Sequence, residues 1–199
     1  MKIIIASSNK GKLKEFQDLL KGHEIYLASD FVKEFDPIEN GNSFKQNAKI
    51  KAKALWQALE NKEDYCVIAD DSGLCVEALD NLPGIYSARF GDDFEGEFAN
   101  KDAKNRAKLK NELIKLGIDF SKASFVCVLC FISKDKMEFA KGTCDGTIIL
   151  NEVGENGFGY DSMFIPFGLD KSFAELNQDE KNKISHRFKA LEELKKIFD

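Results

Sequence analysis

The sequence predicts a mixed α/β fold, in which helices pack on a sizeable β-sheet. Compact apolar runs of strand length alternate with longer segments whose apolar residues keep helical spacing. Hydrophobic residues make up 43% of the 199 residues, which is ordinary globular usage and enough for a substantial core. No Gly/Ser-rich linker, internal repeat or low-complexity tract divides the chain. We therefore expect a single domain over residues 1–199.

The first half of the chain is expected to form strands and helices in alternation. The elements predicted there are a strand over 3–6, a helix after the polar SSNKGK segment, a helix capped by Ser43, and strands over 65–69 and 74–79 joined by an acidic turn. The helix after Ser43 carries an apolar stripe on one face, and its other face is rich in lysine: Lys45, Lys49 and Lys53.

The second half continues the pattern with longer strands. The elements predicted there are a helix over about 102–116, a strand over 124–132, strands over 137–140 and 147–150, and a last helix over about 179–198.

Charge and cysteine content limit the class of protein. The 29 basic residues against 34 acidic ones give a formal net charge of -5, so the sequence offers no basic excess for nucleic acid. The apolar run in MKIIIASSNKGK is too short for a signal-peptide core or a membrane span. Cys127 and Cys130 form a CxxC within a strand-like run, which places them on opposite faces. We expect a cytoplasmic protein in a reducing compartment, with no membrane or nucleic-acid partner.

The segment 7–12, SSNKGK, lies between a predicted strand and a predicted helix. Unpaired amide N–H groups and the positive end of the helix dipole suit an anion there, and two lysines add donors. The segment lacks the GxxxxGK[ST] pattern of a P-loop. It is either a phosphate-binding loop or an ordinary helix start with solvated lysines.

Two adjacent carboxylates, Asp70 and Asp71, follow the apolar run that ends at residue 69. Magnesium prefers a few carboxylate oxygens together with water and substrate phosphates. An acidic pair near a phosphate loop is therefore typical of a magnesium site. The alternative is an Asx-type turn that ends the strand.

A glycine-dense stretch ends in FGYDSMFIP, residues 158–166. Phe158 or Tyr160 could stack on a flat heterocycle while Asp161 accepts hydrogen bonds. Aromatic residues and glycines also occur in ordinary hairpin turns. The stretch is therefore either a nucleoside-binding segment or a plain hairpin turn.

A group of donors follows near the C-terminus. Lys181, His186 and Arg187 could donate to a purine O6 or to phosphate oxygens. A surface or capping position for the histidine is the alternative.

Six motifs, in order, make the chain similar to the inosine triphosphate pyrophosphatases: ASSNKGKLKEF, SFKQNAKIKA, IADDSGLCVEAL, PGIYSARF, GFGYDSMFIP and KNKISHRFKAL. The resemblance covers nearly the whole chain. It implies an elongated mixed sheet with two lobes and a cleft between them, and a homodimer. It also implies hydrolysis of ITP, dITP and XTP to the nucleoside monophosphate and pyrophosphate, which would keep these nucleotides out of DNA and RNA.

The resemblance also implies roles for individual residues. The triphosphate would be held by Ser7, Ser8, Asn9, Lys10, Gly11, Lys12 and Lys51. Asp71 would be the catalytic acidic residue and a ligand of Mg²⁺, and Ser72 would touch substrate. The nucleoside would be held by Phe158, Gly159, Tyr160 and Asp161. Lys181, His186 and Arg187 would read the base and its neighbouring phosphate.

The chain departs from the usual family pattern in two places. Many relatives carry an acidic metal ligand where this chain has Ile38, and Glu39 is the nearest substitute. Relatives commonly have Glu where this chain has Gln46, which removes a negative charge near the expected phosphate site.

Two other functions are alternatives to this one. The FGYD and SHR motifs argue against a Maf-like pyrophosphatase, which prefers other nucleotides. The Asp70–Asp71 pair argues against a nucleotide-binding regulator, because carboxylates near a polyphosphate require a metal.

Overall fold

The structure, a computed structural model, describes residues 1–7 and 10–198. Within this part of the chain, six strands form one sheet in the order β2-β1-β3-β4-β5-β6. The strands are β1 (Lys2–Ile5), β2 (Glu24–Leu27), β3 (Cys66–Val76), β4 (Phe120–Ile132), β5 (Met137–Ile149) and β6 (Phe164–Pro166). Strand β1 pairs in parallel with β2 and β3, whereas β5 and β6 are antiparallel. The mixed α/β class is confirmed.

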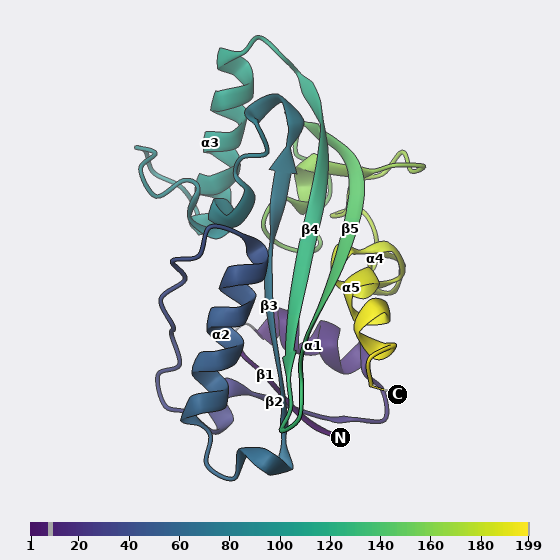
Figure 1. The fold of residues 1–199 in the computed structure, drawn as a ribbon. Helices are drawn as coiled ribbons and strands as arrows, with labels where there is room; N and C mark the ends of the chain where they lie inside the picture. The colour runs from purple at the N-terminus through teal and green to yellow at the C-terminus, as the bar shows by residue number, and fades with distance from the viewer. Residues whose placement is uncertain (8–9, 199) are drawn as a thin grey trace. The chain divides into compact units, whose positions relative to one another are not determined.

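The α-helices of this part of the chain are distributed along its whole length (Figure 1). They are α1 (Lys10–Leu19), α2 (Phe44–Ala58), α3 (Lys101–Lys115), α4 (Gln178–Ile184) and α5 (His186–Lys195). Among the described residues, no helix has the length and apolar character needed to cross a bilayer.

The chain divides into two compact units. The first unit comprises Met1–Asp71, Cys127–Gly142 and Arg187–Asp199, and the second comprises Ser72–Val126 and Thr143–His186. Strands β3, β4 and β5 each contribute residues to both units.

The core of the first unit has helices on both sides of its strands (Figure 1). Ile3, Ile5 and Ile68 share a face with apolar residues of α1 and α5, since alternate strand residues point the same way. Helix α2 lies on the other side and buries the stripe Ala48, Ala52 and Leu55.

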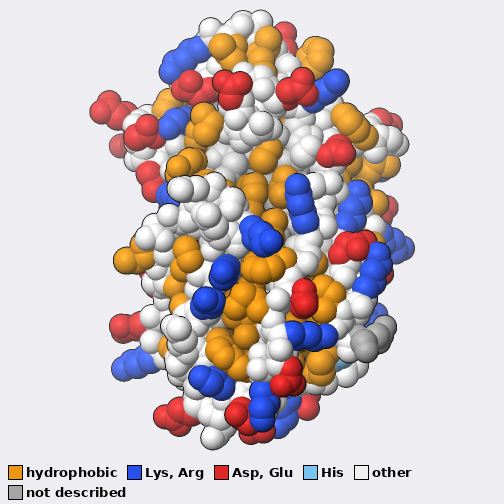
Figure 2. Space-filling view, viewed as in Figure 1, with side chains coloured by type: hydrophobic (Ala, Val, Ile, Leu, Met, Phe, Trp, Pro, Cys, Tyr) orange, Lys and Arg blue, Asp and Glu red, His pale blue; other side chains and the backbone are white. Residues whose placement is uncertain are grey.

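The start and the outer face of α2 confirm the prediction for this helix. The Ser43 hydroxyl accepts a hydrogen bond from the Gln46 amide at 3.2 Å, which caps the first turn. Lys45, Lys49 and Lys53 are exposed, and Figure 2 shows basic side chains over this helix.

The core of the second unit is aromatic. Phe125 contacts Phe164 and Phe173, with ring centroids 4.7 and 5.9 Å apart. Leu109 and Leu113 of α3 are fully buried against the same cluster. These three phenylalanines therefore serve packing in this unit.

Two of the predicted breaks between strands are absent from the described residues, because the strands run on. The expected acidic turn at 70–73 lies inside β3, so that prediction is wrong. Its carboxylates are tolerated in a strand because basic side chains surround them, as described below. Likewise, 137–140 and 147–149 belong to one strand, β5, in which buried and more exposed residues alternate without a break. A Cβ atom on Gly146 of this strand would overlap the carbonyl oxygen of Ile165, so glycine allows β6 to pair closely.

The predicted last helix is interrupted. Ser185 has an extended backbone (φ -66°, ψ 154°) and separates α4 from α5. Its N–H still donates to the Lys181 carbonyl at 2.9 Å, which ends α4. Helical spacing of the apolar residues continues across the break, so the sequence pattern did not reveal it.

Candidate active site

Asp70 is the most deeply buried carboxylate of β3, with 1% of its surface exposed. Its oxygens accept from Lys12 Nζ at 2.9 Å and from Arg187 Nη2 at 3.1 Å. Burial alone would raise the pKa of Asp70, but the positive charges of Lys12 and Arg187 outweigh it and hold the pKa well below its usual range. Asp70 is therefore a permanently ionised anchor.

Arg187 lies between two carboxylates. It is 2% exposed, and its Nη1 donates to Glu15 while Nη2 donates to Asp70. Lys12 and Glu15 are three residues apart, which places them on one face of α1. Burial would lower the pKa of Arg187, but Glu15 and Asp70 raise it further, so the guanidinium stays charged.

Asp71 points to the opposite face of β3, towards α2. Its Oδ2 accepts from Asn47 Nδ2 at 3.1 Å, and its Oδ1 lies 3.5 Å from Lys51 Nζ. Asn47 and Lys51 are four residues apart, so one face of α2 presents both. Burial raises the pKa of Asp71 and outweighs the opposing effects of Lys51 and Asn47. A carboxylate with a raised pKa is suited to accept a proton.

Glu39 joins the same group through Lys51, whose Nζ donates to it at 3.1 Å. Carboxylate oxygens of Asp71 and Glu39 thus converge on one ammonium group. Two hard oxygen donors around a positive charge fit the ligand set of a divalent cation that also binds water and phosphate. The described residues hold no group of three or more His, Cys, Asp or Glu side chains placed to bind a metal.

Gln46 closes the loop before α2. Its Oε1 accepts from the Asn42 amide at 2.6 Å, and Asn47 Oδ1 accepts from the Gly41 amide at 2.9 Å. The neutral side chain therefore performs a local hydrogen-bonding role.

The SSNKGK segment is described in part. Ser7 follows β1, and Gly11 and Lys12 lie in the first turn of α1, which confirms the strand, connection and helix order. Ser8 and Asn9 lie outside the described residues, and so does the side chain of Lys10.

In the second unit, Asp161 joins Phe158 to Lys181. Asp161 Oδ2 accepts from the Phe158 amide at 2.8 Å and from Lys181 Nζ at 2.7 Å. Lys181 Nζ also lies 4.8 Å from the centre of the Phe158 ring. Asp161 and Lys181 are buried, whereas Phe158 is 43% exposed. A buried ion pair thus supports an exposed aromatic ring.

Tyr160 and His186 are buried in the same unit. The Tyr160 hydroxyl donates to the Ser87 carbonyl at 2.9 Å, and burial raises the pKa of Tyr160. The His186 ring stacks on Phe125 with centroids 5.0 Å apart. Of the two rings considered for stacking on a ligand, Phe158 is the exposed one.

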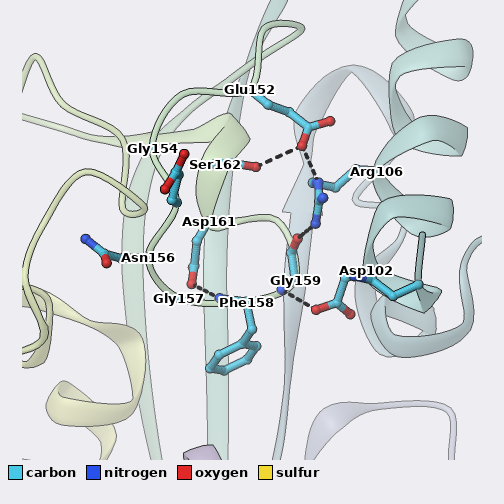
Figure 3. A pocket seen from close by; sticks show the side chains of 12 residues that line it. Asp102, Arg106, Glu152, Gly154, Asn156, Gly157, Phe158, Gly159, Asp161 and Ser162 are labelled. Atoms are coloured by element: carbon cyan, nitrogen blue, oxygen red, sulfur yellow. Dashed lines mark hydrogen bonds and ion pairs between the residues drawn. The ribbon is translucent and has the colours of Figure 1, made fainter. Parts of the chain in front are cut away.

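A cavity of about 280 Å³ lies beside this segment (Figure 3). Its lining includes Asp102 and Arg106 of α3 and Glu152 of the loop before Phe158. Sequence reasoning missed these residues, together with Glu15 and Asn47. Glu15 and Asn47 fall inside the quoted motifs, which was an available signal.

The fold and these charged groups define an α/β protein in which lysine and arginine side chains surround two adjacent strand carboxylates. The chain belongs to the Ham1 family, whose model matches residues 3–197.

The relatives of this chain match it over nearly its whole length. A protein of Campylobacter jejuni subsp. jejuni serotype O:6 named dITP/XTP pyrophosphatase is 50% identical over 194 residues, 96% of this chain and 94% of the relative. One of the same name from Aliarcobacter butzleri is 41% identical, covering 100% and 98%. The solved Staphylococcus aureus Ham1 protein superposes with a TM-score of 0.84 at 39% identity, covering 100% and 98%. The recognised family and the fold are confirmed.

Proposed function

We propose that this chain hydrolyses ITP, dITP and XTP to the nucleoside monophosphate and pyrophosphate, and so removes these purines before they enter DNA or RNA. The observation that carries the proposal is Asp71, a buried carboxylate with a raised pKa held by Asn47 and Lys51. The names of the relatives, which match nearly the full chain, support the substrate class. Residues 1–199 would act as one catalytic domain.

The first unit would bind the triphosphate. Segment 7–12 would supply backbone donors, and Lys12 and Lys51 would supply positive charge. Ser72, the first residue of the second unit, is proposed as a further contact. The oxygen of a water molecule attacks the α-phosphorus, the bond to the bridging oxygen breaks, and pyrophosphate leaves. Asp71 orients this water and takes its proton, a role typically contributing about 10²–10⁴-fold. Lysine charges stabilise the negative charge that accumulates on the phosphate oxygens.

Mg²⁺ is the metal we propose, held by Asp71 and Glu39. When bound, it would neutralise phosphate charge and orient the leaving group. Lys51 contacts both carboxylates, so it would keep them in place while the substrate is absent.

The second unit would bind the nucleoside. Phe158 offers its exposed ring for stacking, and Gly159, Tyr160 and Asp161 fix the backbone around it. Lys181 and His186 would donate to the 6-oxo group of hypoxanthine or xanthine, and the 6-amino group of adenine would be rejected. Arg187, which belongs to the first unit, is the third donor proposed. For it to contact substrate, its guanidinium must release Glu15 or Asp70.

We propose a cytoplasmic homodimer that binds neither membrane nor nucleic acid. The negative net charge supports the last point. The homodimer is proposed from the resemblance to the inosine triphosphate pyrophosphatases alone. Light scattering at micromolar concentration should give the dimer mass, and a monomer mass would contradict the proposal.

One assay tests the activity. Pyrophosphate release should be fast with ITP and XTP, slow with ATP and dTTP, and dependent on Mg²⁺. Preference for dTTP would favour a Maf-like enzyme, and tight ITP binding without turnover would favour a regulator. Equal rates with ITP and GTP would overturn the base specificity and leave the pyrophosphatase class standing.

A further inference from the structure

One face of α3 holds the loop that carries Phe158. Asp102, Arg106 and Lys110 are spaced four residues apart, which places them in a row on this helix. All three contact the segment 152–159. We call Asp102 and Arg106 the α3 clamp, because they grip the Gly159 residue through both its amide and its carbonyl (Figure 3).

The two grips are well-formed hydrogen bonds. Asp102 Oδ2 accepts from the Gly159 N–H at 2.8 Å, and Arg106 Nη1 donates to the Gly159 carbonyl at 2.8 Å. Each pairs a charged group with a backbone group, which makes it stronger than a neutral hydrogen bond.

Glu152 secures the clamp from the loop side. Arg106 Nε and Lys110 Nζ both donate to this carboxylate at 2.7 Å, and the Ser162 hydroxyl lies 3.3 Å from it. Arg106 thus bridges the start of the loop and the residue after Phe158, and its planar guanidinium suits such a two-sided contact.

The clamp acts on the residue next to an exposed ring. Phe158 is 43% exposed, but its own amide is bound by Asp161, and the next amide and carbonyl are bound by Asp102 and Arg106. Gly159 has a φ of +62°, a conformation that a backbone without side chain adopts readily and also leaves readily. Side-chain hydrogen bonds to this loop therefore help to hold the ring in one place, together with the Lys181 ammonium group over the ring.

We propose that Asp102 and Arg106 are positioning residues that hold Phe158 ready for a purine base and so determine affinity for base-bearing ligands. The inference rests on the proposed function, since it needs Phe158 to contact the nucleoside. Neither residue touches the phosphates in this scheme. Loss of the clamp therefore raises KM more than it lowers kcat.

A purely structural role gives a different expectation. Asp102 is in the first turn of α3, where a negative charge stabilises the helix by interacting with the helix dipole. Under that reading, Asp102→Asn would lose as much as Asp102→Ala in stability, and neither would change KM. Under our proposal, Asn still offers an acceptor oxygen to the Gly159 N–H, so it retains function that Ala loses.

The test compares Asp102→Ala, Asp102→Asn and Arg106→Lys with the wild type, using Lys115→Ala as the matched control. Lys115 is exposed on the same helix and pairs with Glu112. We expect Asp102→Ala to raise KM for ITP at least about fivefold and to weaken IMP binding by calorimetry equally. Arg106→Lys should also raise KM, since an ammonium group cannot reproduce the forked contact. Asp102→Asn should stay within about twofold.

Wild-type KM and IMP affinity in both Asp102→Ala and Arg106→Lys would overturn the proposal. Equal damage by Asn and Ala at position 102 would overturn it too, because charge would then matter and not the hydrogen bond. If Asp102→Ala fails to fold, Arg106→Lys decides. Failure of the proposed function would look different: the wild type would release no pyrophosphate from ITP, whatever the clamp variants do to IMP binding.

Discussion

Exchanging Asp70 for Asn tests how far the first unit depends on its buried charges. The change keeps the shape and one acceptor oxygen but removes the negative charge that Lys12 and Arg187 share. Asp71→Asn is the matched control, because it makes the same chemical change at the next residue of the same strand. The two environments differ in sign: the pKa of Asp70 is lowered, and that of Asp71 is raised.

The expected loss follows from burial. Breaking a buried ion pair by removing one partner typically costs about 3–5 kcal/mol, because the remaining charge is left uncompensated. Arg187 keeps Glu15 as a partner, so we expect Asp70→Asn to lie near the lower value, about 3 kcal/mol. For a protein of this size, each kcal/mol lowers Tm by about 2–4 °C, which gives a drop of roughly 6–12 °C.

Asp71→Asn should lie within about 1 kcal/mol of the wild type, since the structure shows no net stabilisation of that charge. Asn can still accept from Asn47, and Lys51 keeps its contact with Glu39.

The pH dependence has opposite signs at the two positions. A carboxyl whose pKa is lower in the folded state stabilises the fold above its unfolded pKa, and this is lost as the pH falls towards the folded value. The gap between wild type and Asp70→Asn should therefore be full at pH 7 and narrow below about pH 4. Ionisation of Asp71, with its raised pKa, costs stability as the pH rises, and Asp71→Asn removes that cost.

Urea unfolding and thermal melting of the three proteins at pH 7 and at a series of lower pH values measure these effects. The reasoning is refuted if Asp70→Asn melts within about 2 °C of the wild type, less than one kcal/mol for this chain length. It is also refuted if Asp71→Asn is the less stable variant.

Three variants, Asp71→Asn among them, test the site. Asp71→Asn should lower kcat for ITP at least about tenfold in steady-state assays. A variant that keeps more than about a tenth of the wild-type kcat would contradict the role of Asp71 as a base. Gly157→Ala should raise KM for ITP, because its Cβ would overlap Asp161 Oδ2 and its φ of +77° disfavours a side chain; an unchanged KM would count against the role of Asp161. Tyr160→Phe should lose the contact with Ser87 and about 1 kcal/mol by urea unfolding, and an unchanged midpoint would show that this hydrogen bond contributes nothing.

Local patterns predicted much of the fold. The Ser43 cap, the buried stripe of α2 and the strand that precedes α1 were all predictable, because capping and periodicity act over a few residues. The position of Asp70 inside a strand could not be predicted in this way. Its partners Lys12 and Arg187 lie 58 and 117 positions away, so a strand able to hold two carboxylates looked like a turn.

The candidate site divides in the same way. The residue types in the sequence indicated Asp71 and Phe158, because carboxylates and aromatic rings carry recognisable chemistry, whereas Lys51 was indicated by the family resemblance alone. Asp102 and Arg106 were missed, since charged residues on a helix are usually solvated and their contact with Gly159 spans more than fifty positions. Their four-residue spacing is common on any exposed helix.

Because Asp70 and Asp71 are adjacent, the first part of β3 cannot tolerate a change in its number of residues. One peptide bond separates a carboxylate that serves α1 and α5 from one that serves α2, and strand residues alternate in direction. Losing or gaining a single residue in the first part of β3 would turn each carboxylate towards the other's partners and bury two charges wrongly. Insertions and deletions should therefore be excluded from positions 66–71 of functional variants, whereas conservative substitutions of the apolar residues there are tolerated.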